Sequence, residues 1–219
     1  MTFELLRRVV TIPRPFLIAC EGYGDVRLVD KLLQHHDIGN CCVGCPSRDF
    51  SDDNLSDYLK AVRSILDIKG TAILGVLVMV DADVSPVSAF TSACNALASG
   101  GFPSPTAPFA IEELNPRCAV YVMPGERRSG TLEHLLLEAA YQERPKSKEC
   151  TDRFLDCLGR ANLTENQEAK MRMSTLIGAS CKGKPWASAA MIWSQNENPV
   201  PIDSPSFAHL ADFLRRFSQ

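Results

Sequence analysis

An unbroken apolar run near position 75 places the strongest constraint on how this chain of 219 residues can fold. The letters TAILGVLVMV, residues 71–80, contain no charged side chain. A strand of this composition has no polar face to turn toward water, so helices must cover both of its faces. We therefore predict that Ala72–Val80 is the central strand of a mostly parallel sheet flanked by helices.

Shorter apolar runs alternate with amphipathic stretches on both sides of this segment. Further strands are expected at Phe16–Cys20, Asn40–Val43 and Ala119–Met123. Between them, helical spacing of apolar residues predicts helices near Asp53–Leu66 and Pro86–Ala98, and another in GYGDVRLVDKLLQHH after the first strand. This alternation is typical of an α/β fold.

The last third of the chain reads as helical. From Gly130 onward it contains the stretches TLEHLLLEAAY, CTDRFLDCLGRA and ENQEAKMRMSTLIGA, and IDSPSFAHLADFLRRF at its end suits a capped terminal helix. We expect residues 1–129 to form the α/β core and residues 130–219 a helical portion packed on it, as one compact unit.

Composition excludes several classes of protein. With 45% hydrophobic and 22% charged residues, the chain resembles ordinary globular proteins rather than disordered or fibrous ones. No apolar run reaches 18 residues, and Glu4, Arg7 and Arg8 interrupt any N-terminal signal segment, so we expect a cytoplasmic protein that does not enter the membrane. The net charge of -3 does not indicate a basic nucleic-acid binder, although a metal ion held by carboxylates adds positive charge that this count omits.

Acidic residues follow two of the predicted strands directly. Glu21 comes after the first strand, with Asp25 four residues later, and Asp81 and Asp83 come after the central strand. If these strands are neighbours, the acids meet at one edge of the sheet, where ligands of parallel sheets bind. An extended backbone would point Asp81 and Asp83 to one side.

Carboxylates gathered in this way repel one another unless they are protonated or share a cation. Ligands that are all oxygen favour Mg²⁺ or Mn²⁺ over zinc or copper. Each acid also has a simpler interpretation, because an acid after a strand often only caps a helix. That alternative stays open for Asp25, and Glu133 near a helix start is equally suited to the positive end of the helix dipole.

The cysteines of CCVGC, which are Cys41, Cys42 and Cys45, leave three alternatives open. Their spacing includes a C-x-x-C pair that can hold zinc or undergo redox chemistry. No second ligand pair stands at a suitable distance in the sequence, and free cysteines in apolar stretches pack as small hydrophobic residues. Packing is therefore the interpretation we favour.

Two long segments resemble a known family. FLIACEGYGDVRLVDKLL followed by TAILGVLVMVDADVSP resembles the TOPRIM domain, whose pattern is a glutamate after the first strand and a DxD after the third. The later MPGERRSGTLEHLLLEA, KMRMSTLIGASCKGKPW and PSFAHLADFLRRF are similar to small stand-alone TOPRIM-related proteins of unknown function, and through them to the TOPRIM part of OLD-family nucleases. The resemblance covers about residues 16–217.

The resemblance implies a site residue by residue. It makes Glu21, Asp81 and Asp83 metal ligands or acid/base groups, with Asp25 and Glu133 completing a second metal position. OLD-like nucleases also use a lysine downstream of the acids. The candidates here are Lys170, Lys182 and Lys184, and the sequence does not choose among them.

The function implied is Mg²⁺- or Mn²⁺-dependent cleavage of a phosphodiester in DNA or RNA, with a mobile-element defence system as one setting. The chain has no GxxxxGK[ST] motif, so nucleotide-driven control would need a separate ATPase partner protein. The alternative is a non-catalytic TOPRIM-fold module that binds or regulates within a larger complex. The sequence does not exclude a homo-oligomer.

Overall fold

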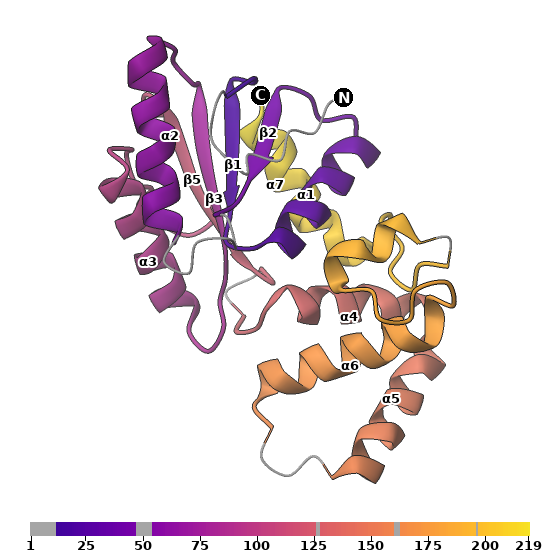
Figure 1. Cartoon of the computed structure of the whole chain (residues 1–219). Coiled ribbons are helices and arrows are strands. Elements are labelled where there is room, and N and C mark those ends of the chain that lie inside the picture. Colours follow the sequence, from indigo (N-terminus) through magenta and orange to yellow (C-terminus); the bar gives the residue numbers. More distant parts are fainter. Residues whose placement is uncertain (1–11, 47–53, 126–127, 160–162, 196) are drawn as a thin grey trace.

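A five-stranded sheet carries the α/β fold in the computed structural model, which describes residues 12–46, 54–125, 128–159, 163–195 and 197–219 (Figure 1). Its strand order is β2-β1-β3-β5-β4. The strands are β1 (Phe16–Cys20), β2 (Cys41–Gly44), β3 (Gly75–Asp81), β4 (Ile111–Glu112) and β5 (Arg117–Met123). Only β4 is antiparallel to its neighbour, so the expected mostly parallel sheet with β3 in its middle is confirmed.

The structure differs from the prediction at the start of the central strand and in having an additional edge strand. The central strand begins at Gly75 rather than Ala72, and Leu74 just before it is 61% exposed. Gly75 lies against two aromatic rings, since a Cβ there would meet Phe16 Cδ1 at 2.9 Å and Phe217 Cζ at 3.0 Å. The short edge strand β4 was not predicted, because two residues carry no periodic signal.

Helices cover both faces of the sheet, as the apolar central strand requires. In Figure 1, α2 (Leu55–Lys69) and α3 (Pro86–Ser99) lie on one side, and α1 (Tyr23–His35) and α7 (Ala208–Phe217) lie on the other. Alternate residues of each strand enter two separate cores. In β3, Leu77 and Met79 pack toward α1 and α7, whereas Val76, Val78 and Val80 pack toward α2 and α3.

The C-terminal portion is helical, as predicted. It contains α4 (Leu132–Glu143), α5 (Pro145–Leu158), α6 (Glu165–Ser180), the 3₁₀ turns η1 (Ala189–Ser194) and η2 (Pro205–Phe207), and α7. Figure 1 shows α5 and α6 projecting away from the sheet, whereas α7 returns to it. The Phe217 ring lies 5.5 Å from that of Phe16, and Arg117 Nη1 donates to the Phe217 carbonyl at 2.9 Å. The last helix is thus part of the sheet's own core.

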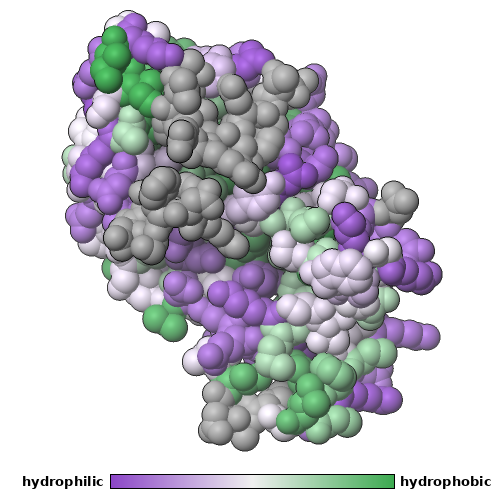
Figure 2. All heavy atoms as spheres, in the orientation of Figure 1, coloured by the Kyte–Doolittle hydropathy of each residue, from purple (hydrophilic) through white to green (hydrophobic). Residues whose placement is uncertain are grey.

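Hydrophobic side chains also reach the surface. Figure 2 shows them at the lower end of the molecule, over the far ends of α5 and α6. Phe154, Leu158 and Met171 are exposed there, Leu158 to 60%. Within the described ranges, none of the helices has both the length and the apolar character that crossing a bilayer requires.

Candidate metal centre

The carboxyl ends of β1 and β3 lie side by side and bring their acids together. The two strands pair in parallel from Phe16 opposite Gly75 to Cys20 opposite Met79, and the pairing continues as Glu21 N–H donates to the Met79 carbonyl at 3.0 Å. Glu21 and Asp81 therefore meet at one edge, as predicted from their places in the sequence. The N-termini of α1 and α4 add Asp25 and Glu133 to the same edge.

Glu21 and Asp81 are each oriented by a backbone N–H group. Glu21 Oε2 accepts from Asp81 N at 3.2 Å, and Asp81 Oδ1 accepts from Leu132 N at 2.9 Å. The second bond joins the end of β3 to the first residue of α4, 51 positions later in the chain. Asp81 thereby caps α4, a role that the sequence did not indicate.

Asp25 and Glu133 are held in the same manner. Asp25, buried at the third position of α1, accepts from Gly22 N through Oδ2 at 2.8 Å. Glu133 accepts the hydroxyl proton of Thr131 through Oε2 at 2.8 Å. The capping interpretation of Asp25 is thus correct, yet it engages only one oxygen. In each of the four carboxylates, the second oxygen accepts no hydrogen bond from a described residue.

The protonation of the buried acids reflects this crowding. Burial raises the pKa of Asp81 to about 8, aided by the negative charges of Asp25, Glu21 and Glu133, while the Leu132 N–H bond opposes the shift. Burial likewise raises the pKa of Asp25 to about 7, against the bond from Gly22 and with further repulsion from Glu21 and Glu133. The charged neighbours that raise both pKa values are all carboxylates, as at a site built for a cation.

This donor set fits Mg²⁺ or Mn²⁺ in its chemistry. The ligands offered are carboxylate oxygens from four elements, and hard divalent ions prefer oxygen. In the part of the chain that the structure describes, no three acidic, histidine or cysteine side chains are already arranged to hold an ion. Binding would therefore require these carboxylates to turn inward, which their mutual repulsion opposes when no cation is present.

Asp83 is held differently from these four carboxylates. Its backbone has a φ of 48° and forms a bridge with Gly130, so the extended geometry that would align its side chain with that of Asp81 is not present. Its Oδ1 accepts from Asn166 Nδ2 at 2.9 Å, at the start of α6. The extended backbone on which the expectation for Asp81 and Asp83 depended is therefore not present, and Asp83 is tied to the helical portion through Asn166.

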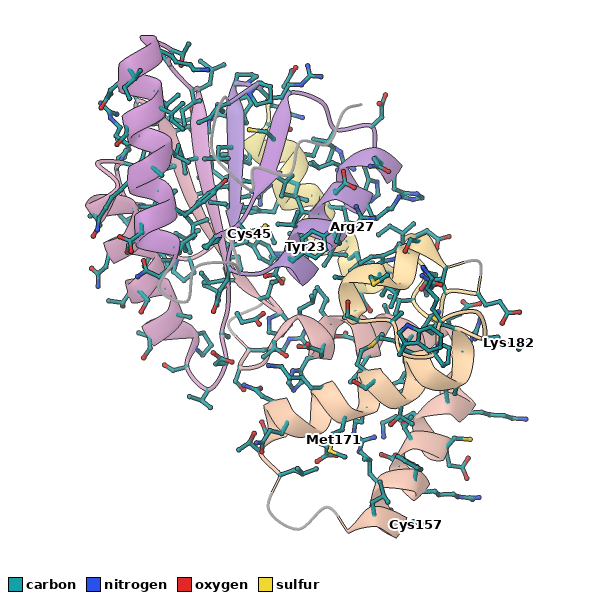
Figure 3. All side chains as sticks on the ribbon, viewed as in Figure 1. Tyr23, Arg27, Cys45, Cys157, Met171 and Lys182 are labelled. Carbon is teal, nitrogen blue, oxygen red and sulfur yellow. The ribbon has the colours of Figure 1, made fainter. Side chains whose placement is uncertain are left out.

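The candidate lysines differ in their distance from the acids. Lys170 lies one turn after Asn166 on α6, so both residues share the face that meets Asp83. Lys184 and Lys182 follow the far end of α6, about 22 Å along the helix axis from its start. Lys182 pairs there with Glu197 at 3.2 Å and lies at the outer edge of the molecule in Figure 3. Of the three, Lys170 is the lysine that the fold brings nearest to the acids.

The three cysteines around β2 pack on different sides. Cys42 is buried toward α2, and its thiol donates to the Phe16 carbonyl at 3.4 Å. Cys41 and Cys45 pack toward α1, where Figure 3 shows Cys45 near Tyr23. Burial raises the pKa of Cys41 to about 12, which makes its thiolate rare. This arrangement agrees with the packing interpretation.

A cavity of about 710 Å³ opens beside the acids. Glu21, Asp81 and Asp83 are among its lining residues, and the start of α2 and the residues of α3 from Ser88 to Ala96 form its walls. Serines at positions 85, 88 and 92 face it from α3, a spacing of three and four that was present in the sequence as a polar stripe on an otherwise apolar helix. The contact between Asn166 and Asp83 joins residues 83 positions apart, and no pattern in the sequence indicated it.

Comparison with known proteins gives one match. A family model described as "Protein of unknown function (DUF3226)" matches residues 15–219. Neither the curated proteins nor the solved structures provide a match to the chain.

Proposed function

This chain belongs to the DUF3226 family, whose function is unknown, and we propose from the site itself that it cleaves phosphodiesters of DNA or RNA with the aid of Mg²⁺ or Mn²⁺. The observation that carries the proposal is the set of four carboxylates from β1, α1, β3 and α4. Each is oriented through one oxygen and keeps the other available. The resemblance to TOPRIM and OLD-family nucleases supports the same chemistry.

Glu21, Asp25, Asp81 and Glu133 are the residues that would hold the ion. A bound divalent ion would polarise a phosphoryl oxygen and offset the negative charge that develops during cleavage. Glu21 is exposed, whereas Asp25 and Asp81 are largely enclosed. Glu21 is therefore the carboxylate best placed to accept a proton from an attacking water. Lys170 on the Asp83 side would approach the substrate phosphate as a cation.

The test is a cleavage assay with matched variants. Purified protein is incubated with Mg²⁺ or Mn²⁺ and with single- and double-stranded DNA and RNA. Glu21→Gln should lose about 10²-fold or more of the cleavage rate, because it removes both a ligand and the general base. Glu143→Gln, an exposed acid at the end of α4, should cleave like wild type.

A wild type that binds Mn²⁺ but cleaves none of these substrates would contradict the proposal. It would favour the binding or regulatory module, working within a larger complex. A role in a defence system, together with a separate ATPase partner protein, is part of the proposal and rests on the resemblance to OLD-family nucleases.

A further inference from the structure

The cavity beside the acids has a lining that selects for a particular ligand chemistry. It is lined by Glu21 and Asp81, by α3 from Ser88 to Ala96, and by Leu55 and Ser56 at the start of α2. Its volume of about 710 Å³ lies in the range of small-molecule sites, roughly 300–1,000 Å³. It is therefore large enough for a nucleoside and too small for a folded partner.

The charge on the described lining of this cavity is all of one sign. Among the described residues that line it, the charged ones are Glu21, Asp81 and Asp83, and all three are acids. The rest of the described lining is uncharged and consists of the Asn54 amide, serine hydroxyl groups such as those of Ser88 and Ser92, and apolar side chains. The described part of this wall offers a phosphate backbone no cation to follow, whereas a neutral base and sugar do not need one.

Two hydroxyl groups of the wall have no partner in the described part of the chain. Ser85 Oγ is engaged, since it accepts from Ser88 N at 3.2 Å and caps α3. Ser88 Oγ and Ser92 Oγ form no hydrogen bond to a described side chain or carbonyl, and both residues are exposed on the cavity wall. They are free to donate to or accept from the edge of a base.

We propose that this cavity receives one unpaired nucleoside of the substrate, next to the phosphate that the acids handle. The inference rests on the proposed function, because whatever fills the cavity must be joined to a phosphate at Glu21 and Asp81. A base in a duplex is stacked and paired, so it would have to leave the helix to enter. The substrate class is accordingly single-stranded nucleic acid, or a single-stranded end or loop.

The test uses wild type and two α3 variants. Ser92→Trp fills the cavity two helical turns from the Ser85 cap, away from the acids, and Ser88→Trp fills it one turn closer. Val87→Trp is the matched control, because Val87 is 75% exposed on the same helix and does not line the cavity. Binding of a labelled single-stranded oligonucleotide and of a duplex is measured by fluorescence anisotropy in Ca²⁺, another oxygen-seeking ion. The melting temperature with and without Mn²⁺ reports on the metal site separately.

Wild type should bind the single strand at least about tenfold more tightly than the duplex, a difference equal to about 1.4 kcal/mol. Ser92→Trp should lose the preference for the single strand but should still show a higher melting temperature with Mn²⁺. Val87→Trp should keep both the preference and the rise in melting temperature. Equal affinity for both forms, or unchanged binding by Ser92→Trp and Ser88→Trp, would overturn the inference and leave the metal site standing. A wild type without a Mn²⁺ response or oligonucleotide binding would end the proposed function and this inference together.

Discussion

Asp81 shows how one residue can serve the fold and a site at once. Through Oδ1 it caps α4 by accepting from Leu132 N, and through burial beside Asp25, Glu21 and Glu133 its pKa rises to about 8. Because the pKa is raised in the folded state, protonation favours folding. The stability that protonation provides is fully present below about pH 4 and is lost as the pH rises toward 8.

Asp81→Asn should therefore stabilise the metal-free protein. The amide oxygen can still accept from Leu132 N, but the variant carries no charge to repel its neighbours. In EDTA at pH 8 we expect a gain of about 0.5–2 kcal/mol in the free energy of unfolding, shrinking toward pH 5, where wild-type Asp81 is protonated in the folded state. Thermal melts at both pH values measure it.

In several millimolar Mn²⁺, Asp81→Asn should no longer be more stable than wild type, and wild type should become equally or more stable. Wild type gains stability from ion binding, and the variant loses a ligand. Asp67→Asn, which removes an exposed partner of Arg63, serves as the control and should change little in any condition. An Asp81→Asn protein that is less stable in EDTA, beside a wild type without a metal response, would show that the carboxylate is only a cap.

At the scale of elements, α7 ties the end of the chain to the first and third strands. Phe217 is fully buried, its ring meets Phe16, and its carbonyl accepts from Arg117. The ring also lies over Gly75, where no larger residue fits without displacing it. The terminal helix is thus a structural part of the α/β core, although it belongs to the helical portion in sequence.

Phe217→Ala should accordingly destabilise the whole protein. Truncating a buried phenylalanine typically costs about 3–5 kcal/mol, from lost burial and the cavity left behind. Phe154→Ala on the projecting α5, where the ring is 46% exposed, should cost far less. Chemical denaturation of the two variants compares them directly, and equal stabilities would mean that α7 does not pack on the sheet as described.

At the scale of the whole molecule, the charge distribution bears on how nucleic acid would bind. The net charge is -3, and some exposed cations are paired with acids, as Arg128 is with Glu138 and Lys182 is with Glu197. Arg127, the neighbour of Arg128 in the sequence, lies outside the described residues. The negative net charge favours binding in which a metal ion, rather than a basic groove, supplies much of the positive charge that meets the phosphates.

Binding of nucleic acid should depend only weakly on salt. With about two phosphate contacts from cationic side chains, the slope of log K against log salt concentration should be no steeper than about -2. The slope is measured by binding titrations at salt concentrations from about 50 to about 200 mM, once with Mn²⁺ and once with EDTA. A steep slope that persists in EDTA would indicate a basic surface, and the first residues to replace would be Arg127, Arg128, Lys182 and Lys184.

The sequence by itself determined the layout of the sheet and the edge at which the acids lie. An apolar run without a polar face has to be a covered central strand, and residues directly after parallel strands have to emerge at the same edge. Phe16–Cys20 as β1 and the central place of β3 follow from these local rules, whereas Glu21 meets Asp81 because β1 and β3 are neighbours, which the sequence left as a condition.

The tertiary structure alone decided which acids converge and what surrounds them. Asp83 adopts a positive φ and bridges to Gly130, and its carboxylate accepts from Asn166 in the first turn of α6, the helix that starts at Glu165 and carries Lys170 one turn after Asn166. These contacts join residues that are tens of positions apart in the chain. Local periodicity carries no information about such pairs, since their geometry depends on how whole elements pack against one another.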